Sequence, residues 1–142
     1  PSVASGYFRD PVMTADRFVD GWFNTGDYVR MEEGCVRILD RVTDIIIVGG
    51  FNVYPQEVEA ILHTHPAVSQ AVVVGMPHPV NGEVPKAFIQ LREGMQVTSR
   101  EIIDFCKKHL AHFKVPRSVE FMESFPLSST GKVLRRMLKQ PK

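Results

Sequence analysis

Residues 45–62 read IIIVGGFNVYPQEVEAIL, and this stretch decides the fold of the chain. It begins with an apolar, β-branched run, which is typical of a buried strand. Gly49 and Gly50 break that run, and Pro55 fits the first position of a helix whose early glutamates suit its N-terminus. Apolar residues at helical spacing follow. We therefore predict a strand, a glycine turn and a helix, in that order.

The sequence beyond this stretch continues to alternate between strand and helix patterns. Three apolar segments predict further strands, at residues 68–74, 85–91 and 119–122. Thr98 and Glu101 have the spacing of a capping box, which predicts a second helix, and a last short helix is expected after Lys132. Because strands and helices intermix, we predict a small α+β domain over residues 41–142, with a short central sheet flanked by helices.

The N-terminal part of the chain has a different pattern. Strand-like residues at 22–30 and 35–39 are separated by Glu32, Glu33 and Gly34, which favour a hairpin turn. Residues 1–40 are too few to bury a core alone. We interpret them as a β-hairpin remnant of a larger N-terminal domain. Because the chain does not begin with Met, we expect it to be a piece of a longer protein.

The composition is that of an ordinary globular domain. The chain has 142 residues, 44% of them apolar, and a net charge of +1, which argues against a nucleic-acid-binding or membrane-surface protein. No apolar run approaches the roughly 18 residues that a membrane span needs. Cys35 and Cys106 stand far apart, and the histidines lack zinc-site spacing. We expect a cytoplasmic protein with reduced thiols, no transmembrane segment, no nucleic-acid partner and no metal site.

A lysine near the C-terminus lies in a loop-like sequence that could meet a phosphate. Residues 126–136 read PLSSTGKVLRR, so Lys132 follows a loop rich in small residues. A nucleotide P-loop would need glycine at the position of Pro126 and Ser or Thr at that of Val133, so the motif is excluded. A lysine on a mobile loop can still stabilise negative charge in a site built from other residues.

Three motifs in order and in spacing give a family resemblance. They are GWFNTGD at 21–27, LDRVTDIIIVGGFNVYPQEVE at 39–59, and the lysine loop. Together they resemble adenylate-forming enzymes, and the GGxNVYPxEVE form of the second motif resembles the acyl- and aryl-CoA synthetases. The resemblance covers residues 6–136. It implies the C-terminal portion of an acid–CoA ligase, with the mobile C-terminal domain in residues 41–142.

The resemblance implies roles for three charged residues. Asp27 matches the aspartate that binds the ATP ribose, and Arg41 matches an arginine at the ribose and phosphates. Lys132 matches the catalytic lysine of adenylation, which would stabilise charge on the α-phosphate and the attacking carboxylate. Simpler interpretations stay open: a turn-capping Asp27, an Arg41 paired with a neighbouring aspartate, Asp40 or Asp44, and a solvent-exposed Lys132.

A second group of residues matches the part of the family that handles CoA. Gly49 and Gly50 match a loop that lines the path of the CoA pantetheine arm. Phe113, Lys114 and Arg117 match a segment that holds the CoA nucleotide in some relatives, and an aromatic ring between cations suits that task. A tight turn at the glycines and a core phenylalanine between surface cations are the structural alternatives.

Thr43 is a departure from the family pattern. It stands where the family usually has Asp or Lys, at the hinge about which the small domain rotates between half-reactions. Threonine is β-branched and stiffer in χ1, but its backbone is not locked as that of proline would be. We expect rotation to be retained.

The parent enzyme implied by the resemblance converts ATP, a carboxylic acid and CoA to acyl-CoA, AMP and pyrophosphate, with Mg²⁺ on the phosphates. The acid would be fatty or aryl, which suggests a place in fatty acid metabolism. The family's phosphate loop and acyl pocket are absent from this sequence, so the fragment alone is expected to be inactive. ATP, CoA, the acid and the N-terminal domain of the same chain are the expected partners.

Two alternatives remain at this stage. An adenylation domain that loads a carrier protein, or a luciferase-like oxygenase, would use the same first step with a different acceptor or outcome. A non-catalytic module could instead dock an acidic partner or RNA through a basic tail. That tail would consist of Lys132, Arg135, Arg136, Lys139 and Lys142.

Overall fold

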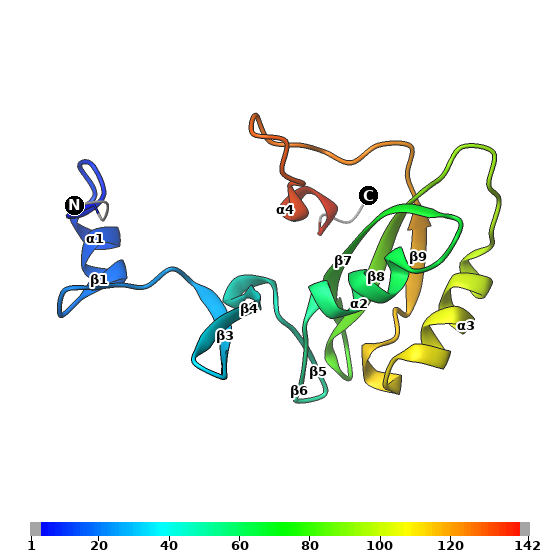
Figure 1. Cartoon of the computed structure of the whole chain (residues 1–142), viewed down its shortest axis with the longest axis horizontal. Coiled ribbons are helices and arrows are strands. Elements are labelled where there is room, and N and C mark those ends of the chain that lie inside the picture. The colour runs from blue at the N-terminus through cyan, green and yellow to red at the C-terminus, as the bar shows by residue number, and fades with distance from the viewer. Residues whose placement is uncertain (1–3, 140–142) are drawn as a thin grey trace. The chain divides into compact units, whose positions relative to one another are not determined.

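A computed structural model describes residues 4–139 of the chain. The contacts within it divide the chain after Thr43 into two compact units (Figure 1). The first unit ends at Thr43 and the second begins at Asp44. Lys142, which we placed in a basic tail, lies outside the described residues.

In residues 4–43, the first unit contains a short helix and two hairpins. Helix α1 (Pro11–Arg17) starts where Asp10 accepts a hydrogen bond from the amide of Met13, with proline in the first turn. Strands β1 (Phe18–Val19) and β2 (Trp22–Phe23) form the first hairpin, and β3 (Asp27–Glu32) and β4 (Cys35–Arg41) the second. The second hairpin confirms the predicted turn, but α1 was not predicted.

The strand predicted over residues 22–30 is interrupted, and the prediction is wrong in this respect. Gly26 has a φ of +74°, and its amide donates to the side chain of Asn24 at 2.9 Å. This local turn separates β2 from β3 because the chain leaves the extended conformation there. As a result Asp27 becomes the first residue of β3.

The second unit contains a five-stranded sheet in the order β6-β5-β8-β7, with β9 also paired to β8. Its strands are β5 (Ile46–Val48), β6 (Phe51–Val53), β7 (Val68–His78), β8 (Gly82–Leu91) and β9 (Ser118–Phe121). The β8–β9 pairing is parallel and the others are antiparallel. Strand β7 extends beyond the predicted residues 68–74 because β8, its partner, continues as far as Gly82.

Two helices pack on one face of this sheet. They are α2 (Pro55–His63) and α3 (Ser99–His109). The predicted capping box is present, because Thr98 and Glu101 exchange side-chain-to-backbone hydrogen bonds at the start of α3. Val58 and Leu62 of α2 and Ile102 of α3 are fully buried in one core cluster with sheet residues. The predicted α+β fold class is confirmed.

The C-terminal segment covers the opposite face. Because alternate residues of a strand point to opposite faces, Val73 belongs to the helix side while Val72 and Val74 belong to a second cluster. That cluster includes Phe125 and Leu138, the last residue of the short helix α4 (Arg135–Leu138). The lysine loop thus lies between two segments that are anchored on the sheet.

Candidate active site

Asp27 and Arg41, the two predicted nucleotide contacts, form an ion pair in the first unit. The Nε of Arg41 lies 2.8 Å from Oδ1 of Asp27. The two residues are cross-strand partners of β3 and β4. A second nitrogen of the Arg41 guanidinium donates to the carbonyl oxygen of Thr25 at 3.2 Å. The side chains stay reachable from solvent, with 19% exposure for Asp27 and 59% for Arg41.

The pairing of Asp27 with Arg41 was not predicted, and the structural alternative for Arg41, an ion pair with Asp40 or Asp44, named the wrong partners. Neither Asp40 nor Asp44 forms its ion pair. Asp40 is buried, and one of its carboxylate oxygens accepts a hydrogen bond from the backbone amide of Arg41 at 2.8 Å. The geometry leaves a carboxylate and a guanidinium together at one end of a hairpin. Such a pair can accept from ribose hydroxyls and donate to phosphate oxygens.

Thr43, the predicted hinge residue, lies in a single turn of 3-10 helix, Val42–Asp44, and is exposed. The amide of Val42 donates to the carbonyl oxygen of Gly26 at 2.9 Å, so the first unit holds the chain up to this point. The boundary between the two units lies immediately after Thr43. Thr43 therefore occupies the position where a change in backbone dihedral angles would reorient the second unit.

The lysine loop is a hydrogen-bonded hairpin and does not lack internal structure. The amide of Ser128 donates to the carbonyl oxygen of Lys132 at 2.7 Å, and the amide of Lys132 donates to the Ser128 hydroxyl at 3.1 Å. Further in, Leu127 and Val133 form an isolated bridge. Gly131 has a φ of +78°, which closes the turn. The backbone at Lys132 is thus held by its own loop.

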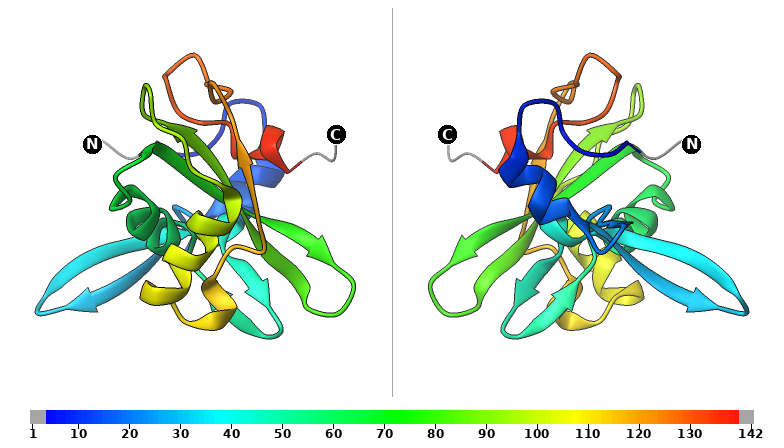
Figure 2. Two further views of the ribbon diagram at one scale, coloured as in Figure 1. Left: turned by 90° about the vertical axis from the view of Figure 1, so that its right-hand side faces the viewer. Right: turned by 90° about the vertical axis from the view of Figure 1, so that its left-hand side faces the viewer.

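The side chain of Lys132 is exposed, and within residues 4–139 its ammonium forms no ion pair or hydrogen bond. In both Figure 1 and Figure 2 this loop extends from the second unit at the end opposite to the β5–β6 hairpin. Val133, next to Lys132, packs on the side of the sheet opposite α2 and α3, whereas Phe113 packs on the side of these helices. The candidate adenylation loop and the candidate CoA segment therefore belong to different faces of one sheet.

Gly49 and Gly50 form the two-residue turn between β5 and β6. Their φ angles are +56° and +89°, and Val48 pairs with Phe51 across the turn. Positive φ at both central residues is the requirement of a type I′ hairpin turn, which explains the glycine pair. Within the described residues no atom beyond its chain neighbours would lie within 4 Å of a Cβ at Gly50. The turn therefore offers open backbone that a ligand can approach.

The residue after the glycine turn carries an aromatic ring that was not predicted to belong to the site. Phe51, the residue after Gly50, stacks on Phe113 with a centroid distance of 4.9 Å and an interplanar angle of 26°. Phe51 is 59% exposed. Phe51 lies within the second family motif, directly after the glycine pair. This position in the sequence could have identified it as a candidate site residue. The glycines and the Phe113 segment, predicted separately, thus form one continuous surface.

The two cations of the Phe113 segment have different surroundings. Lys114 forms an ion pair with Glu57 at 2.6 Å, and its ammonium lies 5.8 Å from the centre of the Phe113 ring. Arg117 is exposed, and its amide donates to the carbonyl oxygen of Pro85 at 2.8 Å. Lys114 is therefore already neutralised by α2, whereas Arg117 presents its charge to solvent.

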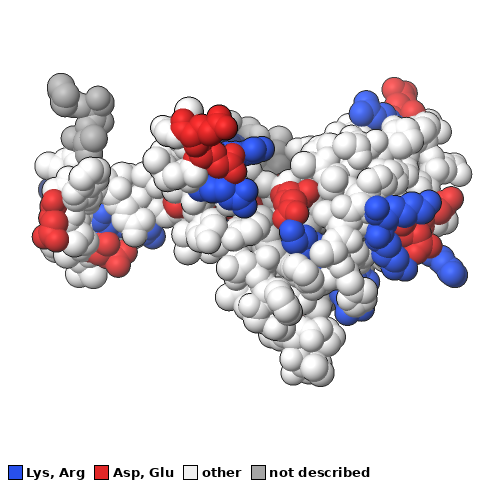
Figure 3. All heavy atoms as spheres, turned by 60° about the horizontal axis from the view of Figure 1, so that its bottom comes forward, with Lys and Arg blue, Asp and Glu red and all other residues white. Residues whose placement is uncertain are grey.

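The basic tail proposed as an alternative docking surface is not a row of exposed cations. Arg135 is about three-quarters buried and forms a close ion pair with Glu59 at 2.6 Å. On the face drawn in Figure 3, basic and acidic side chains of the described residues intermingle and form no broad surface of one sign. The ion pair with Glu59 removes Arg135 from any such surface.

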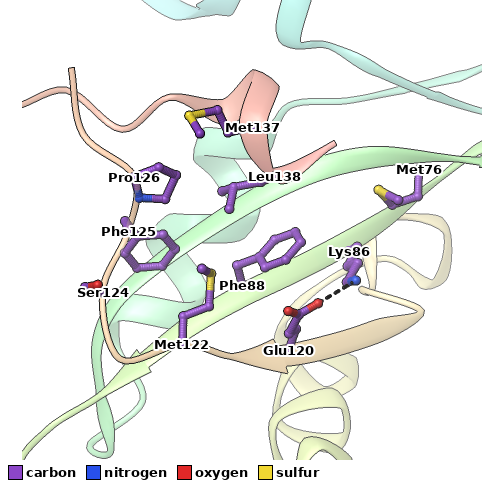
Figure 4. A pocket seen from close by; sticks show the side chains of 10 residues that line it. All are labelled: Met76, Lys86, Phe88, Glu120, Met122, Ser124, Phe125, Pro126, Met137 and Leu138. Carbon is purple, nitrogen blue, oxygen red and sulfur yellow. Dashed lines mark hydrogen bonds and ion pairs between the residues drawn. The ribbon is translucent and has the colours of Figure 1, made fainter. Parts of the chain in front are cut away.

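A hollow of about 470 Å³ lies beside the base of the lysine loop. Figure 4 shows its wall, where the ammonium of Lys86 contacts the carboxylate of Glu120 at 2.8 Å. The rest of the wall is mainly apolar and includes Met76, Phe88, Met122, Phe125, Met137 and Leu138. The hollow is lined by residues of the sheet and of the C-terminal segment, and its lining includes no residue that was predicted to act in the reaction.

The described residues include no group of three or more His, Cys, Asp or Glu side chains that could hold a metal ion. Over the same residues, no helix has both the length and the apolar character to cross a membrane. Cys106 is buried, and burial raises the pKa of its thiol to about 11, whereas Cys35 is exposed. A free cysteine with a raised pKa is a poor nucleophile, so Cys106 has a packing role.

Residues 57–132 match the family described as "AMP-binding enzyme C-terminal domain". The chain is 45% identical over 139 residues to a long-chain-fatty-acid–CoA ligase of Bacillus subtilis, covering 97% of this chain and 25% of that protein. It therefore spans about a quarter of the length of the curated relatives it matches.

Two solved structures are also similar. ATP-bound MatB from Rhodopseudomonas palustris has a TM-score of 0.89 and 36% identity, over 94% of this chain and 27% of that one. The amide bond synthetase McbA from Marinactinospora thermotolerans has a TM-score of 0.87 and 39% identity, over 94% and 28%. Both likenesses extend across nearly the whole of this chain.

Proposed function

This chain belongs to the family of AMP-binding enzyme C-terminal domains, and we propose that it is the C-terminal part of an ATP-dependent acid–CoA ligase. Residues 1–40 would be the end of the large N-terminal adenylation domain. Residues 41–142 would contain the hinge and the mobile C-terminal domain. The parent enzyme would activate a fatty or aryl carboxylic acid and transfer the acyl group to CoA.

In the first half-reaction the carboxylate of the acid attacks the α-phosphate of ATP. A P–O bond forms, the bond to pyrophosphate breaks, and acyl-adenylate and pyrophosphate result. Lys132 would contact both the α-phosphate and the carboxylate, where negative charge develops in the transition state. Asp27 would accept hydrogen bonds from the ribose hydroxyls, and Arg41 would donate to ribose and phosphate oxygens. Mg²⁺ would arrive on the phosphates of ATP, as part of the substrate.

In the second half-reaction the CoA thiol attacks the acyl carbonyl carbon. A thioester bond forms, the bond to the phosphate oxygen breaks, and AMP leaves with the thiol proton released. The glycine turn at Gly49 and Gly50 would line the path of the pantetheine arm. Phe113 and Arg117 would hold the CoA nucleotide by stacking and by charge. Lys114 would contact the CoA nucleotide while it stays paired with Glu57.

The observation that carries this proposal is the placement of two chemically different faces on one sheet. The loop that carries Lys132 stands at one end of the second unit, and the β5–β6 hairpin with its glycine turn stands at the other (Figures 1 and 2). The stacked rings of Phe51 and Phe113 adjoin that turn. One active site can use both faces only if the second unit rotates between the half-reactions. Thr43 lies at the junction of the units and would be the pivot.

A second candidate function follows from one of the similar structures. An amide bond synthetase shares 39% identity with this chain, so an amine acceptor must be weighed against CoA. The first half-reaction would be unchanged, and the amine nitrogen would attack the same carbonyl carbon. A panel of acceptors offered to the parent enzyme, comprising CoA, holo-carrier protein and simple amines, separates these outcomes.

The test of the proposed function uses the full-length parent with Lys132→Ala. Acid-dependent ATP–pyrophosphate exchange measures the first half-reaction, and acyl-CoA formation from supplied acyl-adenylate measures the second. We expect exchange to fall by roughly a hundred- to a thousandfold, as for removal of one charge-stabilising donor, while the second step survives. Unchanged exchange in this variant would overturn the assignment of Lys132.

A further inference from the structure

Arg135 lies three residues after Lys132 and is held by a bidentate ion pair. One terminal nitrogen of its guanidinium donates to Oε1 of Glu59 at 2.6 Å, and the other donates to Oε2 at 2.9 Å. Glu59 belongs to α2, so the contact joins two segments that are 76 residues apart. Because the two planar groups meet in parallel, the pair fixes orientation as well as distance.

Both members of this ion pair also form hydrogen bonds with the backbone of the sheet. The amide of Val73 in β7 donates to Oε1 of Glu59 at 2.7 Å, and the carbonyl oxygen of Val73 accepts from Arg135 at 2.8 Å. Strand β7 is at the edge of the sheet, so the amide and carbonyl groups of Val73 point outward and have no neighbouring strand to bond with on that side. Arg135 is thereby bound to both a helix and a strand of the rigid core.

A third element enters through Asp44. Its carboxylate oxygen lies 3.7 Å from Nε of Arg135. Asp44 is the first residue of the second unit and follows Thr43 directly. The guanidinium therefore contacts the start of the second unit as well as α2 and β7.

These contacts are sheltered from solvent. The side-chain exposures are 13% for Glu59, 23% for Arg135 and 26% for Asp44. Sheltered charges must be paired, so loss of one partner leaves the other uncompensated. The network is therefore a defined attachment point and not a loose surface contact.

The attachment point sits at the base of the lysine loop. The amide of Leu134 donates to the carbonyl oxygen of Pro126 at 2.8 Å, which closes the loop just before Arg135. Helix α4 has only four residues, Arg135–Leu138, so its own hydrogen bonds cannot set its position. Phe125 and Leu138 anchor the two sides in the core by apolar contact. Arg135 adds the directional contact.

We infer that Arg135 is a positioning residue for Lys132. It fixes the base of the lysine loop against α2, β7 and Asp44, so that the ammonium is presented at a set place relative to the start of the second unit. This inference rests on the proposed function. The glycine turn and Phe113 lie on the other face, so the effect should be confined to the first half-reaction.

The test measures both half-reactions in the full-length parent carrying Arg135→Ala. A displacement of about 1 Å at a reacting group can cost on the order of a hundredfold in rate, and we expect ATP–pyrophosphate exchange to fall by about that factor. Thioester formation from supplied acyl-adenylate should stay within a few-fold. Arg135→Lys, which keeps the charge but loses the bidentate geometry, should give an intermediate loss.

Arg136→Ala is the matched control. Arg136 is the next residue in α4, is exposed, and makes no ion pair within residues 4–139. Its variant should keep both half-reactions at the parental rate. Glu59→Gln removes the partner charge from the other side and should reproduce the selective loss seen with Arg135→Ala. Because Arg135→Ala could fail to fold, thermal unfolding of every variant is recorded, and Arg135→Lys and Glu59→Gln serve as the milder replacements.

Selective loss of exchange in the Arg135 and Glu59 variants supports the inference. A parallel fall of both half-reactions in the folded variants would show a general structural role and overturn it, as would no fall in either. If Lys132→Ala itself leaves exchange intact, the proposed function fails. If Lys132→Ala abolishes exchange while the Arg135 variants behave as the parent, only the inference about Arg135 fails.

Discussion

The guanidinium of Arg41 contacts the carboxylate of Asp27 at 2.8 Å, across the paired ends of β3 and β4. The contact fixes the relative positions of the two candidate nucleotide-binding side chains before a nucleotide binds. Preorganised groups lose less freedom when they bind. The pair therefore acts as one unit, and removing either residue should affect the other.

We expect Asp27→Asn in the parent enzyme to raise KM for ATP roughly ten- to a hundredfold, because a hydrogen bond to a charged group contributes about 1.5–3 kcal/mol. KM for CoA should stay unchanged. Steady-state kinetics with each substrate varied in turn measures both. Arg37→Ala provides the control, because Arg37 lies in the partner strand β4 of the same hairpin and its side chain is exposed. An unaltered KM for ATP in Asp27→Asn would remove the residue from the nucleotide site.

The sequence did not predict the Asp27–Arg41 pair because of a register shift. The two-residue turn pairs Glu32 with Cys35, and a regular ladder would then place Asp27 opposite Asp40. A bulge between Tyr28 and Val29 shifts the pairing by one residue and brings Arg41 opposite. Local patterns predict that a hairpin forms, but they do not reveal where its register slips.

Some features determined by neighbours in the sequence were predicted and others, such as helix α1 and the turn at Gly26, were not; contacts between distant residues were missed. The capping box of Thr98 and Glu101 is complete within four residues, and it is present as predicted. The ion pair of Arg135 and Glu59 spans 76 residues, so Arg135 was interpreted as part of an exposed tail. Its partner becomes visible only once the sheet brings α2 and α4 together.

Gly50→Ala should slow the second half-reaction selectively. The φ of +89° disfavours any side chain, which costs about 1 kcal/mol in stability, and a methyl group would also narrow the open face of the turn. We expect the rate of thioester formation to fall roughly tenfold, because the CoA thiol would be misplaced relative to the acyl carbonyl. ATP–pyrophosphate exchange should be unchanged.

Gly94→Ala is the matched control for this variant. Gly94 has a φ of +74° and equally open surroundings among the described residues, but it lies in the loop after β8. Both variants should lose similar stability in thermal unfolding. Equal slowing of thioester formation in the two would show that strain alone is responsible and would exclude the glycine turn from the path of CoA.

The thiols should differ in reactivity. Burial raises the pKa of Cys106 to about 11, and Cys35 is exposed. A disulfide reagent applied to the native parent at about pH 8 should label Cys35 and spare Cys106, because the thiolate is the reactive form. Mass spectrometry of peptides locates the label, and denatured protein, in which both cysteines react, is the control.

The same shift gives a pH dependence of stability. The folded-state pKa of Cys106 exceeds the ordinary value of 9.0, so the folded chain keeps the proton that the unfolded chain loses. This contribution is intact below pH 9 and is lost as the pH rises toward 11. Denaturant unfolding of the parent and of Cys106→Ala across that range should show a steeper decline in the parent. Identical slopes would contradict the assignment.

Phe51 and Phe113 should contribute to CoA binding as a pair. Each single replacement by Ala removes one face of the stack, and aromatic pairs are coupled by about 0.5–1.5 kcal/mol. We expect each variant to raise KM for CoA several-fold, and the double variant to raise it by less than the product of the two effects. Phe121→Ala is the control, since this partly exposed ring lies in β9, opposite Ile89 of β8 and away from the glycine turn. Strict additivity would show that the two rings act independently, and an unchanged KM would place the CoA nucleotide elsewhere on the parent enzyme.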